Sequence, residues 1–122
     1  MKDFRDLKVW EKAHNLALLV YKHTHPFPKQ ELFGITRQMR RAAVSIATNI
    51  AEGCGRGGNA ELARFLSIAM GSASELEYLL LIAANLGFLN RIDHKELDLA
   101  TTEVKRMLAS LIAKINAEQR KV

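Results

Sequence analysis

Apolar side chains recur at steps of three and four from residue 60 to residue 86, and no proline interrupts them. The repeat comprises Leu62, Phe65, Leu66, Ala69, Ala73, Leu76, Leu79, Leu80, Ala83 and Leu86. A repeat sustained over several heptads is typical of a helix in the seam of a bundle. The pattern therefore predicts one long helix over residues 60–86, with Asn59 as its N-cap and Gly87 closing it.

Two stretches before residue 60 show the same helical period. Residues 7–22 repeat Leu7, Trp10, Ala13, Ala17 and Val20, and residues 35–52 repeat Ile35, Met39, Ala42, Ala43, Ile46 and Ile50. Asp6 is the predicted N-cap of the first helix, which ends before Pro26 because a residue preceding proline avoids the helical region. Gly53 is the predicted left-handed C-terminal cap of the second helix.

A fourth helix is predicted to begin at a capping box formed by residues 93–96 and to fray after Asn116. Mostly short connections separate the four helices, and neighbours joined by short loops run antiparallel. The chain of 122 residues is long enough to bury one core without disulfides. We therefore expect a single all-α domain over residues 1–122, folded as an antiparallel up-down four-helix bundle.

The composition of the chain indicates the cellular compartment and limits the classes of binding partner. Cys54 is the one cysteine, no secretory leader opens the chain, and the longest apolar stretch covers only residues 79–84. These features favour the cytoplasm and argue against a membrane partner. The formal net charge of +5 is compatible with phosphate-bearing or acidic partners but selects none of them.

A polar stripe borders the apolar face of residues 35–52. At 100° per residue, Gln38, Arg41, Ser45, Asn49 and Glu52 fall in one sector. Residues 60–86 offer matching polar positions at Ser72, Ser74 and Glu75. The preferred interpretation is a structural polar network that fixes helix register, with Arg41 paired to Glu75 or Glu52. The alternative is an enzyme site using Ser45, Asn49, Glu52 and Glu75 around a concave pocket.

Catalysis and metal binding find little support in the spacing of residues. No Ser-His-Asp or Cys-His arrangement is indicated, so we expect no enzyme. The glycine-rich loop of residues 53–58 has no preceding strand and no Lys-Ser/Thr pair, which argues against a nucleotide site. His14, His23 and His25 share no helical face, and therefore no metal and no cofactor are expected.

Five arginines are the candidate nucleic-acid contacts: Arg37, Arg40, Arg41, Arg56 and Arg64. Phosphate contacts by arginine are electrostatic and tolerate many sequences. The alternative interpretation is an ordinary solvated face. A separate side of residues 35–52 carries Val44, Ala47 and Ala51, and together with Trp10 it gives more apolar surface than a small monomer conveniently hides. This surplus predicts self-association.

Several local motifs resemble one protein family. They are Asp6-Leu7-Lys8-Val9-Trp10, Tyr21, Phe27-Pro28 with Glu31, Gln38, Arg40-Arg41-Ala42-Ala43-Val44-Ser45, Asn49-Ile50-Ala51-Glu52-Gly53, Phe65, Ala69, Ser72, Glu75-Leu76-Glu77 and Gly87-Phe88. Together they resemble the four-helix-bundle proteins encoded within intervening sequences of bacterial 23S ribosomal RNA genes. The resemblance implies a four-helix bundle that assembles as a homopentamer around a central axis, in a family with no known enzymatic activity. It also implies remote kinship with the accessory variability protein of diversity-generating retroelements, a basic pentamer that binds nucleic acid.

The leading hypothesis is thus a homo-oligomeric bundle, pentameric by resemblance, whose basic surface contacts RNA or DNA. The alternative is a protein-interaction scaffold that docks another macromolecule and does not bind nucleic acid.

Overall fold

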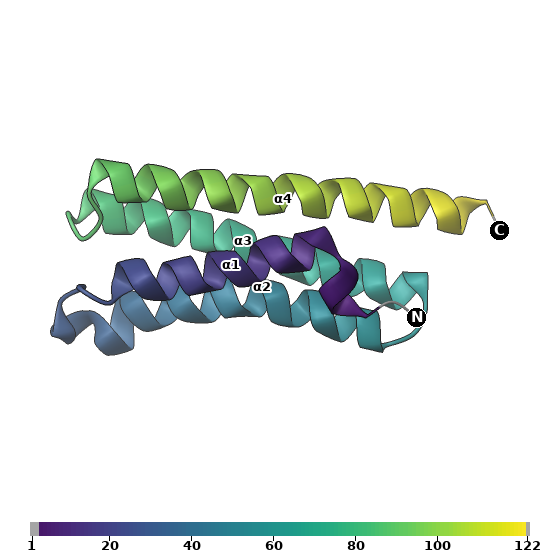
Figure 1. Cartoon of the computed structure of the whole chain (residues 1–122), viewed down its shortest axis with the longest axis horizontal. Coiled ribbons are helices and arrows are strands. Elements are labelled where there is room, and N and C mark those ends of the chain that lie inside the picture. The colour runs from purple at the N-terminus through teal and green to yellow at the C-terminus, as the bar shows by residue number, and fades with distance from the viewer. Residues whose placement is uncertain (1–2, 122) are drawn as a thin grey trace.

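The computed structural model describes residues 3–121, and these form four long helices joined by short segments (Figure 1). The helices are α1 (Lys8–Thr24), α2 (Arg37–Gly55), α3 (Asn59–Asn85) and α4 (Arg91–Arg120). A short 3-10 turn, η1 (Phe4–Asp6), precedes α1, and the turns η2 (Lys29–Glu31) and η3 (Leu32–Thr36) lie between α1 and α2. Residues 3–121 contain no strand. The predicted all-α four-helix fold is confirmed, and Figure 1 shows successive helices running in opposite directions.

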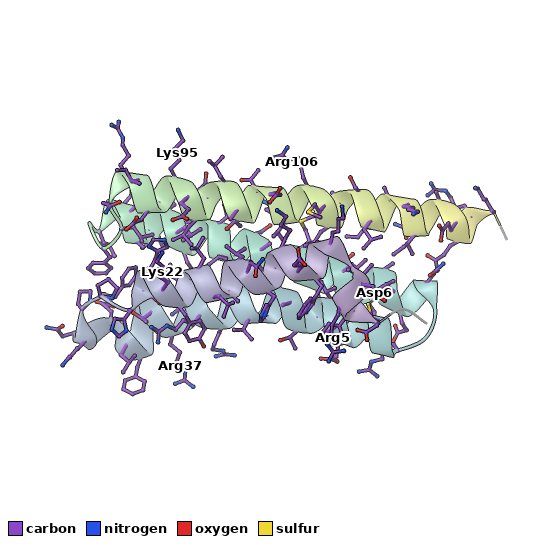
Figure 2. All side chains as sticks on the ribbon, viewed as in Figure 1. Arg5, Asp6, Lys22, Arg37, Lys95 and Arg106 are labelled. Atoms are coloured by element: carbon purple, nitrogen blue, oxygen red, sulfur yellow. The ribbon has the colours of Figure 1, made fainter. Side chains whose placement is uncertain are left out.

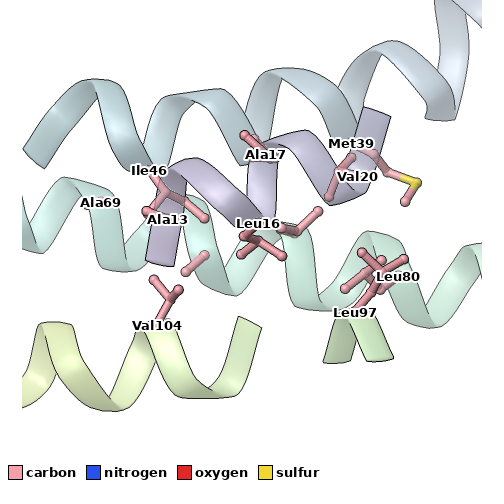
Figure 3. Close-up of a cluster of buried hydrophobic side chains, with 14 of the residues drawn as sticks. Ala13, Leu16, Ala17, Val20, Met39, Ile46, Ala69, Leu80, Leu97 and Val104 are labelled. Atoms are coloured by element: carbon pink, nitrogen blue, oxygen red, sulfur yellow. The ribbon is translucent and has the colours of Figure 1, made fainter. Parts of the chain in front are cut away.

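One hydrophobic cluster takes side chains from all four helices (Figure 3). Its fully buried members include Leu16 of α1, Ile46 of α2, Leu80 of α3, and Leu97 and Val104 of α4. The most extensive interface is that between α2 and α3, and the interface between α1 and α4 is the least extensive of the four. The apolar stripe of each helix therefore faces one shared core, as the helical period predicted.

The N-terminal caps differ from those predicted. Asp6 lies in η1, and Leu7 occupies the cap position of α1 without a side-chain hydrogen bond. Helix α4 begins at Arg91, and its cap is Asn90, whose Oδ1 accepts a hydrogen bond of 2.7 Å from the Asp93 backbone amide. The capping box predicted at residues 93–96 is therefore wrong, because a better-placed side chain caps α4 three residues earlier.

Helix α4 also extends further toward the C-terminus than predicted. The helix continues past Asn116 to Arg120. Ile115 is buried in the core, and Asn59 at the start of α3 donates a hydrogen bond of 3.4 Å to the Glu118 carboxylate. Because these contacts stabilise the last turns, fraying after Asn116 does not occur.

Gly53 is not a left-handed cap but a point of close helix packing. It lies inside α2, which continues to Gly55, and the positive φ angles belong to Gly57 (73°) and Gly58 (127°). A Cβ at Gly53 would lie 2.9 Å from the Phe65 Cβ of α3. Glycine is required here because α3 passes too close for a side chain. Gly87, with φ of 80°, does end α3 in the left-handed conformation, as predicted.

Two other predicted boundaries shift by a few residues. The start of α2 is Arg37 and not Ile35, because η3 contains a π-type turn with a kink at Gly34. Asn59 is the first residue of α3, and Gly58 occupies the cap position, where its carbonyl accepts the Leu62 amide.

Helix α3 is apolar enough to raise the question of a membrane. Of the helices in residues 3–121, α3 alone has the length and composition of a membrane-spanning segment. Its buried residues are Phe65, Leu66, Ala69, Ala73, Leu76, Leu79, Leu80 and Ala83. These side chains pack against α2 and α4, so its central position in the bundle accounts for the apolar composition.

We expect Gly53→Ala to destabilise the fold by about 1 to 3 kcal/mol, because the added methyl group must push α2 and α3 apart. Urea unfolding measures the change. The matched control is Gly71→Ala in α3, where a Cβ meets no atom within 4 Å. Because alanine favours the helix over glycine, this control should stabilise the protein by up to about 1 kcal/mol. Equal stability of the two variants would contradict the close approach at Gly53.

Candidate functional site

A polar groove lies at the surface between α2 and α3. Its volume is about 590 Å³, and it is lined by Phe33, Arg37, Gln38, Arg41, Ala42, Ser45 and Glu75. Successive turns of α2 supply one wall, Glu75 of α3 supplies the other, and Phe33 of η3 stands at the end with 81% of its surface exposed. Figure 2 shows Arg37 projecting from the bundle surface near the start of α2. We call this feature the α2–α3 groove.

Hydrogen bonds join α2 to α3 at one end of the groove. The hydroxyls of Ser45 and Ser72 share a hydrogen bond of 2.9 Å. The Asn49 amide nitrogen donates to the Ser45 carbonyl at 2.8 Å and to its hydroxyl at 3.0 Å. These three residues form the part of the predicted polar network that the structure brings together.

The remaining members of the predicted network do not join it. Gln38 and Glu75 are exposed, and neither side chain makes a hydrogen bond or ion pair with another residue of the range 3–121. Glu52 instead pairs with Arg56 at 3.3 Å, one turn further along the chain. The predicted pairing of Arg41 with Glu75 or Glu52 is therefore wrong, because an exposed guanidinium is solvated by water and needs no buried partner.

The enzyme alternative required a pocket ringed by Ser45, Asn49, Glu52 and Glu75. Only Ser45 and Glu75 line the α2–α3 groove, and Glu52 lies on a different surface, between α1 and α2. A serine also needs a neighbouring base to become a nucleophile, and the hydroxyl of Ser45 is bonded to a serine and an amide. The ring of catalytic groups that the enzyme alternative requires is not assembled in the described part of the chain.

The five candidate arginines do not form one patch. Arg37 and Arg41 line the α2–α3 groove, and within residues 3–121 neither pairs with a carboxylate. Arg40 points to α1, where its Nε donates to the Thr24 hydroxyl at 2.9 Å and its guanidinium lies 4.6 Å from the Tyr21 ring centroid. Arg40 is thus part of the packing between α1 and α2.

Arg56 and Arg64 lie at the opposite end of α2, against the ring of Phe65. Their guanidinium carbons lie 5.1 Å and 4.5 Å from its centroid. Arg64 pairs with Glu61 at 2.9 Å, and this hydrogen bond, together with the arginine charge, lowers the pKa of the Glu61 carboxyl. Because Arg56 pairs with Glu52 in the same way, both cations are already partly neutralised.

An apolar groove of about 620 Å³ lies between α1 and α2. Its lining includes Val44, Ala47 and Ala51, the side of α2 that the sequence singled out, together with Trp10, His14, Ala17, Leu18, Tyr21, Thr48 and Glu52. Leu18, Tyr21 and Val44 are exposed large side chains. Sequence reasoning missed Leu18 because its position falls outside the core period of α1. We call this feature the α1–α2 apolar face.

Fold and surfaces together define a small four-helix protein that carries a polar, cationic groove and an apolar face. The chain matches the family of 23S rRNA-intervening sequence proteins over residues 5–110, and it belongs to that family. It is also similar to a solved structure, described as a protein with unknown function from the S23 ribosomal protein family of Bacteroides thetaiotaomicron. The two share 27% sequence identity with a TM-score of 0.77, over 85% of this chain and 97% of the other. No functionally curated protein matches the chain.

The hydrogen bond between Ser45 and Ser72 can be tested by a double-mutant cycle. Ser45→Ala and Ser72→Ala should each cost about 0.5 to 1.5 kcal/mol of unfolding free energy. Their combination should cost less than the sum by about 0.5 to 1 kcal/mol, because the shared hydrogen bond is lost only once. Ser74→Ala, at an exposed serine of the same helix, serves as control and should change stability by less than about 0.5 kcal/mol. Strict additivity would mean that the two hydroxyls do not interact.

Proposed function

We propose that this protein is a non-enzymatic homo-oligomer that binds RNA or DNA through the α2–α3 groove. The observation that carries this proposal is the placement of Arg37 and Arg41 beside Phe33. Among the five candidate arginines, these two line the groove and have no carboxylate partner in residues 3–121. Phe33 next to them presents an aromatic ring to solvent, with 81% of its surface exposed.

The chemistry of the groove suits a single-stranded nucleic acid. Arginine guanidinium groups bind phosphate oxygens through charge-assisted hydrogen bonds. An exposed aromatic ring offers a stacking platform for an unpaired base, and such stacking tolerates any base. Arg37 and Arg41 lie one helical turn apart on the same face, so both can contact one backbone segment. Double-stranded nucleic acid would leave Phe33 without a base to stack on.

Glu75 on the opposite wall restricts the binding mode. A phosphate placed next to this carboxylate would be repelled, so the backbone must follow the α2 wall of the groove. The Glu75 carboxylate then faces the sugar or base side of the strand, where hydrogen-bond donors are available. The groove thus has one side for phosphates and one side for bases.

The α1–α2 apolar face supports the oligomeric part of the proposal. Exposed Leu18, Tyr21 and Val44 lie on one groove that small alanines keep shallow, which allows a helix of a second copy to approach closely. A closed ring buries such a face on every subunit. The pentamer is proposed from the family resemblance. Repeating the α2–α3 groove around a symmetry axis would raise avidity for a long strand, in the cytoplasm where such strands occur.

A second candidate function rests on the same apolar face. If a different protein covers Leu18 and Val44, the chain is an interaction scaffold that does not need nucleic acid. The two candidate functions need different surfaces. Nucleic-acid binding needs the exposed arginines of the α2–α3 groove, whereas the scaffold needs only the α1–α2 apolar face.

The nucleic-acid proposal predicts that Arg37→Ala combined with Arg41→Ala weakens binding of a fluorescent single-stranded RNA or DNA oligonucleotide by about tenfold or more. The slope of log affinity against log salt should also fall by roughly 1.4, because two phosphate contacts are lost. Fluorescence anisotropy across a salt series measures both quantities.

The control is Arg56→Ala combined with Arg64→Ala, which removes the same formal charge from two arginines already paired with Glu52 and Glu61. We expect at most a small loss for this control. If the two double variants weaken binding equally, net charge alone governs it and the groove has no special role. Absence of binding by the native protein at low salt would remove the proposal.

The oligomer proposal predicts that Leu18→Glu reduces the mass in solution to that of the 13.7 kDa chain, because a carboxylate would be buried in the interface. Light scattering measures the mass, and circular dichroism checks that helices persist. The matched control is Leu99→Glu on α4, since Leu99 is 58% exposed and Leu18 is 57% exposed. The native protein and the control should share a mass that is a multiple of the chain mass. A native protein that is already monomeric would overturn the proposal.

A further inference from the structure

A histidine and two carboxylates meet where the end of α1 lies beside the start of α4. His23 is in the last turns of α1, and its side chain is only 10% exposed. Asp93 and Glu96 are in the first two turns of α4 and remain partly exposed. One ligand atom from each of the three residues lies within 4.8 Å of the others. The group is thus anchored by a buried imidazole and open to solvent through its carboxylates.

Of the two carboxylates, only that of Glu96 is close enough to the imidazole ring of His23 for a good hydrogen bond. Nε2 of His23 lies 2.8 Å from Oε1 of Glu96, which is the length of a charge-assisted hydrogen bond. Nδ1 lies 3.5 Å from Oδ2 of Asp93, which is too long for a good N–H···O hydrogen bond. A neutral imidazole carries one N–H. In the tautomer with its proton on Nε2, the ring donates the short hydrogen bond to Glu96, and Nδ1 is left to act as a metal ligand next to the Asp93 carboxylate.

Two lone-pair donors that face each other repel unless a proton or a metal cation lies between them, and the distance between them differs in the two cases. A tetrahedral zinc ion bonded to one nitrogen and one oxygen at about 2.1 Å separates these two atoms by about 3.4 Å. The separation between Nδ1 and Asp93 Oδ2 is 3.5 Å. A metal-bound histidine usually donates its second ring N–H to a carboxylate, and this hydrogen bond orients the ring and increases its basicity. Glu96, which lies 2.8 Å from Nε2 of His23, occupies the position of that carboxylate.

We infer that His23 and Asp93 bind a divalent transition-metal ion such as Zn²⁺, with Glu96 as the positioning carboxylate. Water completes the coordination of the ion, since only two protein atoms are direct ligands. The two carboxylates of the group attract a dication to a chain that is otherwise basic. The site is separate from the α2–α3 groove, and the inference does not depend on nucleic-acid binding.

The consequence of metal binding follows from the place of the site in the bundle. The interface between α1 and α4 is the least extensive of the four helix interfaces, and an exposed ion pair of 3.4 Å between Lys12 and Glu103 also crosses it. A metal ion bonded to one residue of each helix would cross-link this weak interface. Because the ion binds the folded state, it should stabilise the bundle in proportion to the logarithm of its concentration once bound.

The experiment is thermal unfolding of the full chain with increasing Zn²⁺, compared with Mg²⁺ and with excess chelator. Zn²⁺ should raise the Tm of the native protein, and Mg²⁺, which prefers oxygen ligands, should not. His23→Gln and Asp93→Asn should abolish the zinc-dependent shift. Glu96→Gln should weaken zinc binding by about 10- to 100-fold without abolishing it. His14→Gln is the matched control, because His14 is an exposed histidine of the same helix, and it should keep the full shift.

Two spectroscopic measurements keep the inference testable if a variant folds poorly. Tetrahedral binding of Co²⁺ by the native protein should give visible d–d absorption that Zn²⁺ displaces. Long-range ¹⁵N–¹H NMR of the imidazole should show the proton on Nε2 without metal and a shift of the Nδ1 resonance on adding Zn²⁺. A proton on Nδ1, an unchanged Tm in the native protein, or an equal zinc-dependent shift in His23→Gln would each overturn the inference.

Discussion

The close approach of α2 to α3 is the constraint on which the rest of the bundle depends. Small residues make it possible: Gly53 leaves no room for a Cβ against Phe65, and Ala43 of α2 and Ala73 of α3 are fully buried in the shared core. The short separation brings the hydroxyls of Ser45 and Ser72 into hydrogen-bond range. The same separation fixes the distance between the two walls of the α2–α3 groove. The close approach of α2 to α3 therefore determines both the packing of the core and the geometry of the candidate site.

The sequence predicted the existence of the helices far better than their ends. The apolar period is a property of a whole segment, and each of the four α-helices in residues 3–121 corresponds to one predicted stretch. A cap depends on a single side chain, and several suitable ones lie within a few residues of each other. Asp6 and Asp93 are chemically good caps, yet Leu7 occupies the cap position of α1 and Asn90 caps α4. Gly53 was misassigned because its role comes from Phe65, which no local pattern connects to it.

The candidate sites were predictable within one helix and, between helices, only for the network that joins Ser45 to Ser72. Helical geometry placed Ser45 and Asn49 on one side of α2, and their hydrogen bonds follow that geometry. The other contacts between helices could not be read from spacing, so the sequence missed that Arg40 packs on Tyr21 while Arg37 and Arg41 stay unpaired with carboxylates. The same limit explains His23. A search for a second ligand on its own helix finds none, because the carboxylates that face it come from α4.

The connection between α2 and α3 has a consequence for recognition. Only Arg56, Gly57 and Gly58 separate the two helices, and both glycines adopt positive φ. So short a link, combined with the tight packing at Gly53, leaves the two helices little freedom to move relative to one another. A ligand entering between them would meet walls whose spacing is fixed in advance. Such preorganisation lowers the conformational entropy lost on association, so a shallow groove can still bind usefully.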